Sequence, residues 1–213
     1  MRMVYKVFIG FVVLVIGAFS ASLYAVESEG EKLPTREQLL EVSENDLVFG
    51  SNEAPVTVIE YASMTCSHCA DFHNKAFGAI KEQLIDTGKI RFVYRNFPLN
   101  EPAVRAAMMV DCAPQDSKEK FLKVVFKTQD NWASRKNYLE VLSNIAKLGG
   151  MNGDDFDACV SDEERFEQIT RSRFEGHKVL GVKSTPSFFV NGELYEGNKN
   201  VEFFSAFVKK SGQ

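Results

Sequence analysis

The chain has 213 residues and a formal net charge of −4, with a sequence pI near 5.5. It contains no basic block and no internal repeat, so the composition argues against nucleic acid as a partner and against a repeat architecture. Hydrophobic residues make up 45 % of the sequence, which is ordinary for a globular protein.

The first 25 residues have the order of a secretory signal peptide. Met1 to Lys6 carries two positive charges and no acid, residues 7–23 carry no charge, and small residues lead to Ala25 as a plausible cleavage point. An uncleaved membrane anchor is the alternative, because the apolar run is at the short limit of a spanning helix. Both interpretations predict that the folded part lies outside the cytoplasm.

Residues 26–45 are polar and charge-rich, and we predict a tether or a short leading helix there. The domain itself is expected over residues 46–213. It begins with a buried strand at residues 56–62, which is apolar and β-branched apart from Glu60. A helix follows, and a second strand covers residues 90–97, so this part indicates a βαβ unit.

The residues from about 102 to 180 are expected to be wholly helical. The predicted segments cover residues 104–112, 118–128, 136–148 and 163–180, separated by proline, tryptophan and a glycine-rich stretch. Strand character returns at 186–190, and Asn191-Gly192 predicts a hairpin turn before a short strand at 193–195. A helix at 201–210 closes the chain. The predicted order is β-α-β, a helical insertion, then β-β-α.

Four cysteines in an exported chain point to redox chemistry. Cys66 and Cys69 form a close pair where the first strand gives way to a helix. The Cys66 sulfur would there face unpaired backbone N–H groups and the positive end of the helix dipole, and protonated His68 would add another charge that stabilises a thiolate. We therefore expect a lowered pKa for the Cys66 thiol, with Cys66 as nucleophile and Cys69 as resolving cysteine.

Two other uses of the cysteine pair are open at this point. Cys66, Cys69 and His73 could supply three zinc ligands, although no second close Cys or His pair completes a closed structural site. The pair could also form an inert structural disulfide. Its position after an apolar strand in an exported chain favours redox use, with neither a metal nor a bound cofactor.

Several segments together resemble the DsbA family of bacterial periplasmic thiol-disulfide oxidoreductases. The resemblance lies in Val56–Glu60, in Cys66-Ser67-His68-Cys69, and in Thr185-Pro186 followed by Val190-Asn191-Gly192. It covers roughly residues 46–208 and implies an α/β, thioredoxin-like fold with an inserted all-helical subdomain. It also implies a periplasmic protein that passes its disulfide to reduced or unfolded exported proteins. A membrane quinone-linked partner resembling DsbB would then reoxidise it.

The same resemblance implies roles for individual residues. Pro186 aligns with a cis-proline that faces the cysteine pair and, together with Thr185, holds an extended substrate strand; an ordinary trans proline is the alternative. Glu60 matches a buried acid beneath the pair that assists proton transfer, and the alternative is a solvent-facing carboxylate at a strand end. His68 matches the histidine of the active-site motif.

Cys112 and Cys159 would form a structural disulfide, as in some relatives, or remain two separate buried thiols. Two positions depart from the family pattern: Ser67 stands where the best-known oxidases carry proline, and Thr185 stands where several carry valine. Threonine at that position is also familiar from isomerase relatives. A disulfide isomerase or reductase of the same fold is therefore the alternative function, and a non-catalytic peptide-binding chaperone is a further one.

Overall fold

The structure is a computed structural model that describes residues 32–212. The predicted signal peptide and the start of the predicted tether, residues 26–31, lie outside the described residues. From Leu33 onward the chain belongs to one compact unit. No helix within residues 32–212 is long and apolar enough to cross a membrane.

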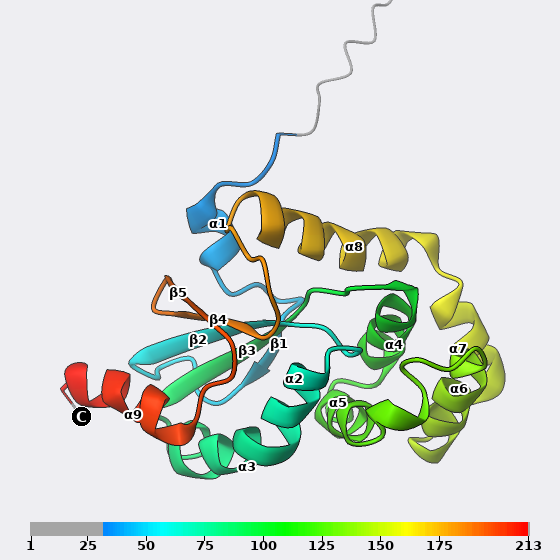
Figure 1. The fold of residues 1–213 in the computed structure, drawn as a ribbon, viewed down its shortest axis with the longest axis horizontal. Helices are drawn as coiled ribbons and strands as arrows, with labels where there is room; N and C mark the ends of the chain where they lie inside the picture. Colours follow the sequence, from blue (N-terminus) through cyan, green and yellow to red (C-terminus); the bar gives the residue numbers. More distant parts are fainter. Residues whose placement is uncertain (1–31, 213) are drawn as a thin grey trace, which may run out of the picture. The chain divides into compact units, whose positions relative to one another are not determined.

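A five-stranded sheet with the order β1-β3-β2-β4-β5 lies between the helices (Figure 1). Its strands are β1 (Leu47–Phe49), β2 (Val56–Ala62), β3 (Ile90–Asn96), β4 (Ser187–Val190) and β5 (Glu193–Glu196). β2 and β3 are parallel, whereas the other three pairings are antiparallel. The predicted βαβ unit is thereby confirmed. β1 was not predicted, because three residues are too few to show an alternating pattern.

The predicted hairpin between β4 and β5 is confirmed as well. Asn191 and Gly192 have φ angles of 49° and 88°. Two successive residues with positive φ are what a tight type I′ turn requires, and Asn-Gly adopts that conformation at the lowest cost.

The two faces of the sheet bury different clusters. Val58 and Ala62 of β2 lie with Phe92 of β3 in the larger core cluster, whereas Ile59 lies with Val93 in the smaller one. This alternation is the period of two of a strand that is buried on both sides. Glu60 has the parity of Val58 and Ala62, so its side chain is directed to the face that carries the larger cluster.

One long irregular helix covers that face. It consists of α2 (Ser67–Asp71), the π-helical turn η1 (Phe72–Ala76), α3 (Phe77–Ile80) and the π-helical turn η2 (Lys81–Ile85). α9 (Val201–Lys210) packs beside it, as Figure 1 shows. The predicted helix is confirmed, and its apolar residues Phe77, Ile80 and Leu84 are all buried. The π-helical turns were not predicted, because a single extra residue per turn leaves no clear mark in an apolar pattern.

The helical insertion is confirmed, with one helix more than expected. It contains α4 (Glu101–Cys112), α5 (Lys118–Lys127), the 3₁₀ turn η3 (Gln129–Asn131), α6 (Tyr138–Leu148), α7 (Gly153–Val160) and α8 (Glu163–Lys178). α7 was missed because the glycine-rich stretch before it was interpreted as a simple break. Asn152 caps α7 by accepting a hydrogen bond from the Asp155 N–H, so the same stretch starts a helix.

The described part of the predicted tether takes the second predicted form, a leading helix. α1 (Arg36–Leu40) begins with a capping box between Thr35 and Gln38. Leu39 and Leu40 pack against the smaller core cluster, and α1 lies near the carboxyl end of α8 in Figure 1. The folded unit therefore begins before residue 46, whereas the sequence analysis expected the domain to start at residue 46.

Arg95 at the end of β3 holds this leading segment on the sheet. Its guanidinium donates to both carboxylate oxygens of Asp46 at 2.7 Å and to the Glu41 carbonyl at 2.6 Å. It also donates to the Leu39 carbonyl and to the Tyr61 hydroxyl. An arginine fork can satisfy this many acceptors at once, so one side chain fixes the path of the chain into β1.

Candidate active site

Cys66 and Cys69 lie at the start of the long helix. Cys66 is the N-cap of α2 with an extended backbone, φ −83° and ψ 121°, and its carbonyl accepts a hydrogen bond from the Ala70 N–H at 3.1 Å. Both cysteines are free thiols; Cys66 is half-buried and Cys69 is buried. The first thiol is thus open to a partner, and the second lies under it.

The loop that enters β4 meets the cysteine pair. The Cys66 thiol donates to the Thr185 carbonyl, with 3.3 Å between sulfur and oxygen, and the Thr185–Pro186 peptide bond is cis. The structure therefore places four of the predicted site residues together, although the loop comes more than a hundred residues after the pair.

The pKa of the Cys66 thiol is lowered from its ordinary value of 9.0 to about 5. The main cause is hydrogen bonding from the Cys69 thiol, which burial partly opposes. The side chain of Thr185 and the backbone N–H groups of Cys69 and His68 lower the pKa further. All of these groups can donate to a thiolate, so they favour the charged form of Cys66.

The predicted low pKa of Cys66 is thus confirmed, and the helix amides are part of its cause. The leading cause was not predicted, because it lies in the second cysteine. The imidazole of His68 is exposed, and its charge is not among the leading causes of the lowered pKa of Cys66. His68 lowers the pKa of Asp71, after the larger effect of Lys75.

The pKa of the Cys69 thiol is shifted in the opposite direction. Burial raises the pKa of its thiol far above the ordinary value, and the hydrogen bond with Cys66 and the charge of Glu60 raise it further. Between about pH 5 and the alkaline range, Cys66 is therefore the thiolate and Cys69 keeps its proton. This division matches the predicted order of nucleophile and resolving cysteine.

Glu60 is fully buried, so the alternative of a solvent-facing carboxylate is wrong. Its Oε2 atom lies 2.8 Å from Nε2 of His73, and its Oε1 atom has no hydrogen-bond partner within the described part of the chain. His73 was one of the three possible zinc ligands, together with Cys66 and Cys69. In the structure its Nε2 atom is directed at Glu60 instead. Within residues 32–212, no group of three or more His, Cys, Asp or Glu side chains is placed to hold a metal ion.

Gln129 is a site residue that the sequence did not reveal. It is only 6 % exposed, and its Nε2 donates to the carbonyls of Met64 and Cys66 at 2.9 and 3.0 Å. η3 of the insertion thus holds the loop that carries the nucleophile. No local pattern could have shown this, because the contact spans more than sixty residues of chain.

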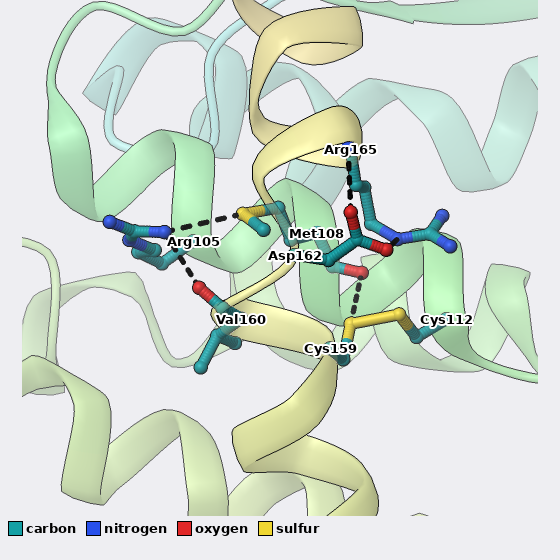
Figure 2. Close-up of a disulfide and its surroundings, with 7 residues drawn as sticks. All are labelled: Arg105, Met108, Cys112, Cys159, Val160, Asp162 and Arg165. Carbon is teal, nitrogen blue, oxygen red and sulfur yellow. Dashed lines mark hydrogen bonds and ion pairs between the residues drawn. A yellow bond between two sulfur atoms is a disulfide. The ribbon is translucent and has the colours of Figure 1, made fainter.

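A disulfide joins Cys112 at the end of α4 to Cys159 in α7 (Figure 2). Its S–S distance is 2.01 Å and its Cα–Cα distance is 6.3 Å. The alternative of two separate thiols is therefore not what the structure shows. Arg105 donates to the Val160 carbonyl at 2.6 Å and ties the same two helices together.

Comparisons with known proteins agree with this geometry. A family profile described as Thioredoxin matches residues 42–210. A Rickettsia bellii protein with the provisional name protein-disulfide oxidoreductase is 33 % identical over 191 residues, which cover 88 % of this chain and 73 % of the relative. A Rickettsia felis protein of the same name is 35 % identical, but the chain spans only 61 % of its length.

Solved structures give the same result. α-DsbA1 of Wolbachia pipientis superimposes with a TM-score of 0.77 at 34 % identity, over 83 % of this chain and 95 % of that one. The chain belongs to the DsbA family. BdbD of Bacillus subtilis has a TM-score of 0.69 at 21 % identity and supports the fold alone.

Both departures from the DsbA pattern lie at the surface of the site. Ser67 is exposed beside Cys66, and Thr185 is half-buried with its carbonyl directed at the Cys66 sulfur. Both residues therefore flank the nucleophile.

Proposed function

We propose that this DsbA protein introduces disulfides into reduced, exported proteins through a Cys66–Cys69 disulfide. A substrate thiolate attacks Sγ of Cys66, the Cys66–Cys69 bond breaks, and its electron pair goes to Cys69, which takes up a proton. A second substrate thiolate then attacks the substrate sulfur of the mixed disulfide. The substrate leaves oxidised, and Cys66 is released as a thiolate.

The low pKa of Cys66 is the observation that carries this direction of electron flow. The low pKa stabilises only the reduced protein, because an oxidised Cys66 has no thiol to ionise. A pKa of about 5 in place of 9.0 favours the reduced form at pH 7 by roughly 2–3 kcal/mol, or about 40–60 mV for a two-electron couple. A protein whose reduced form is stabilised is a stronger oxidant.

The other predicted residues have supporting roles in this proposal. Thr185 and Pro186 hold an extended strand of substrate next to Cys66, and the position of the Thr185 carbonyl supports this. Glu60 exchanges the proton of Cys69, which its burial and its effect on the pKa of Cys69 support. His68 is exposed two residues after Cys66, where its imidazole can contact an incoming substrate.

The proposed setting is the periplasm. Residues 1–25 act as a signal peptide or an uncleaved anchor, and a membrane quinone-linked protein resembling DsbB reoxidises the cysteine pair. No cofactor is part of the proposed reaction, since thiol-disulfide exchange needs only sulfur atoms and protons.

The redox potential of the pair tests the proposal. The purified protein is equilibrated in glutathione buffers, and the oxidised fraction of Cys66–Cys69 is quantified by thiol alkylation, with Cys66→Ala as blank. A potential more oxidising than about −180 mV supports a disulfide donor, and a potential near −270 mV would instead indicate a reductase.

A disulfide isomerase or reductase is the second candidate, and the observation in its favour is Thr185 at the contact with Cys66. Reduction of insulin and refolding of a protein with scrambled disulfides separate these activities from oxidation. A peptide-binding chaperone would keep its activity in Cys66→Ala, whereas each of the redox functions would lose it.

A further inference from the structure

We infer that His73 is a positioning residue that acts through Glu60 to supply the proton that Cys69 takes up when the active-site disulfide opens. The inference rests on the proposed function in so far as Cys66 and Cys69 exchange disulfides. It concerns the opening step itself, which occurs in both directions of electron flow.

The first observation is the buried pair that Glu60 and His73 form. Their Oε2 and Nε2 atoms are 2.8 Å apart, and the two side chains are 0 % and 4 % exposed. β2 directs Glu60 to the face that the long helix covers, and η1 of that helix carries His73 one turn after Cys69. A carboxylate buried alone is costly, whereas a carboxylate and an imidazole can share a proton at no net charge.

The second observation is that the His73 ring is held in place. It stacks on Phe126, with centroids 4.3 Å apart and an angle of 8° between planes. Phe77 and Phe72 pack against it at 5.0 and 5.3 Å. These ring contacts oppose rotation of the imidazole, so Nε2 stays directed at Glu60.

The third observation connects the pair to Cys69. The charge of Glu60 is one of the causes that raise the pKa of the Cys69 thiol. The Oε1 atom of Glu60 is buried without a hydrogen-bond partner in residues 32–212. One carboxylate oxygen is therefore engaged by His73, and the other is the Glu60 atom that this inference assigns to proton exchange with Cys69.

The fourth observation connects the pair to solvent. A small cavity of about 90 Å³ borders His73, and its lining includes Lys81, Glu119 and Lys123. Glu119 and Lys123 are exposed, so this cavity lies between the surface and the imidazole. The ionisable groups that surround His73 from the packed elements are Glu60, Cys69, Tyr94, Lys81, Glu119 and Lys123.

The proton balance is then complete. When a thiolate attacks Cys66, the sulfur–sulfur bond breaks and Cys69 receives its electron pair. Cys69 takes the proton that Glu60 and His73 share, which leaves the carboxylate charged and the imidazole neutral. His73 recovers a proton from the cavity side, and reoxidation reverses each transfer. Histidine suits this position because its two ring nitrogens let the imidazole accept a proton on one side and donate one on the other.

The test compares His73→Gln with the wild type. Glutamine retains a donor that can reach Glu60 but cannot carry the proton. Opening of the oxidised Cys66–Cys69 pair by dithiothreitol is followed by quenched-flow alkylation from pH 5 to 8.5, with rates corrected for the dithiothreitol thiolate fraction. We expect opening at pH 7 to be at least about tenfold slower in His73→Gln, and the shape of its pH profile to differ from that of the wild type.

Matched controls separate this role from a structural one. His177→Gln, at a histidine that bonds the Val182 carbonyl instead, should keep the wild-type rate and profile. The Cys66 thiolate titration should be unchanged in His73→Gln. A wild-type profile in His73→Gln, or a loss of rate that is equal at all pH values, would overturn the inference.

A measurement on the wild type covers the case in which the variant does not fold. The ¹⁵N shifts of the His73 ring should titrate differently in oxidised and reduced protein, and identical titrations would overturn the inference. The two proposals fail separately. Wild-type protein that opens with dithiothreitol but does not oxidise a reduced peptide removes only the proposed function, whereas a wild-type profile in His73→Gln removes only the inference.

Discussion

The thiol of Cys66 donates a hydrogen bond to the backbone carbonyl of Thr185, with 3.3 Å between the two atoms. The carbonyl accepts from the protonated thiol, whereas the Thr185 side chain, Cys69 and the helix amides favour the thiolate. Since the pKa is lowered overall, the groups that favour the thiolate outweigh the carbonyl and burial. The nucleophile is therefore tuned by groups from two separate parts of the chain, the helix start and the loop that enters β4.

A thiolate titration tests this balance. The absorbance of the reduced protein near 240 nm should rise with a midpoint near pH 5, because the pKa of Cys66 is about 5. In Cys69→Ala the midpoint should rise by about one to two pH units, since a hydrogen bond to a charged group is lost. Cys66→Ala should abolish the step, and an unchanged midpoint in Cys69→Ala would show that Cys69 is not the main donor.

The stability of the reduced protein should depend on pH in the acid range. The folded pKa of Cys66 is depressed, so its contribution is complete above the unfolded value and is lost as pH falls through about 5. Reduced protein should lose roughly 2 kcal/mol more than Cys66→Ala between pH 7 and pH 4. Urea denaturation at both pH values measures the difference, and equal losses in the two proteins would refute this linkage.

Replacing Gln129 should loosen the active-site loop. Gln129→Ala leaves the Met64 and Cys66 carbonyls without their donor, and we expect a loss of about 2 kcal/mol in the free energy of unfolding. Gln83→Ala, at an exposed glutamine, should stay within about 0.5 kcal/mol of the wild type. If urea denaturation gives similar values for both variants, Gln129 does not hold the loop.

Arg95→Ala should detach the leading segment from the sheet. It leaves the carboxylate of Asp46 without its partner where both side chains are at most 10 % exposed, so we expect a loss of about 3 kcal/mol. Hydrogen exchange of the α1 amides should accelerate in parallel. Arg135→Ala, at an exposed arginine, is the matched control, and unchanged α1 exchange in Arg95→Ala would contradict the assigned role.

The disulfide of the insertion should contribute to stability and not to catalysis. It closes a loop with a sequence separation of 47 residues, for which chain entropy predicts about 4 kcal/mol. The double variant Cys112→Ala with Cys159→Ala should lose up to this amount in urea denaturation. Its rate of Cys66–Cys69 opening should match the wild type, and a slower rate would place this disulfide in the catalytic machinery.

The sequence revealed those features whose signal is local. The strand that contains Glu60, the helix start at Cys66 and the Asn191-Gly192 turn each depend on neighbouring residues, so their patterns sufficed. The relation of Thr185 and Pro186 to the cysteines came from a family resemblance, since no local rule brings that loop to the pair.

Long-range polar contacts account for what the sequence did not reveal. Gln129, His73 and Arg95 act on groups more than ten residues away, and their partners depend on how helices and strands pack. A glutamine or histidine in a helical pattern gives no indication of which face will be buried. The leading cause of the low pKa of Cys66 was missed for a related reason, because it required knowing that Cys69 is buried.

Cys66 is both the reacting sulfur and the residue that begins α2. The backbone N–H groups of His68 and Cys69 lower its pKa, so they interact with its charge in the reduced protein only. Every turnover should therefore change the chemical environment of two amide protons at a known position. Nuclear magnetic resonance of those two amides would report the redox state of the working protein in real time, without a label on either sulfur.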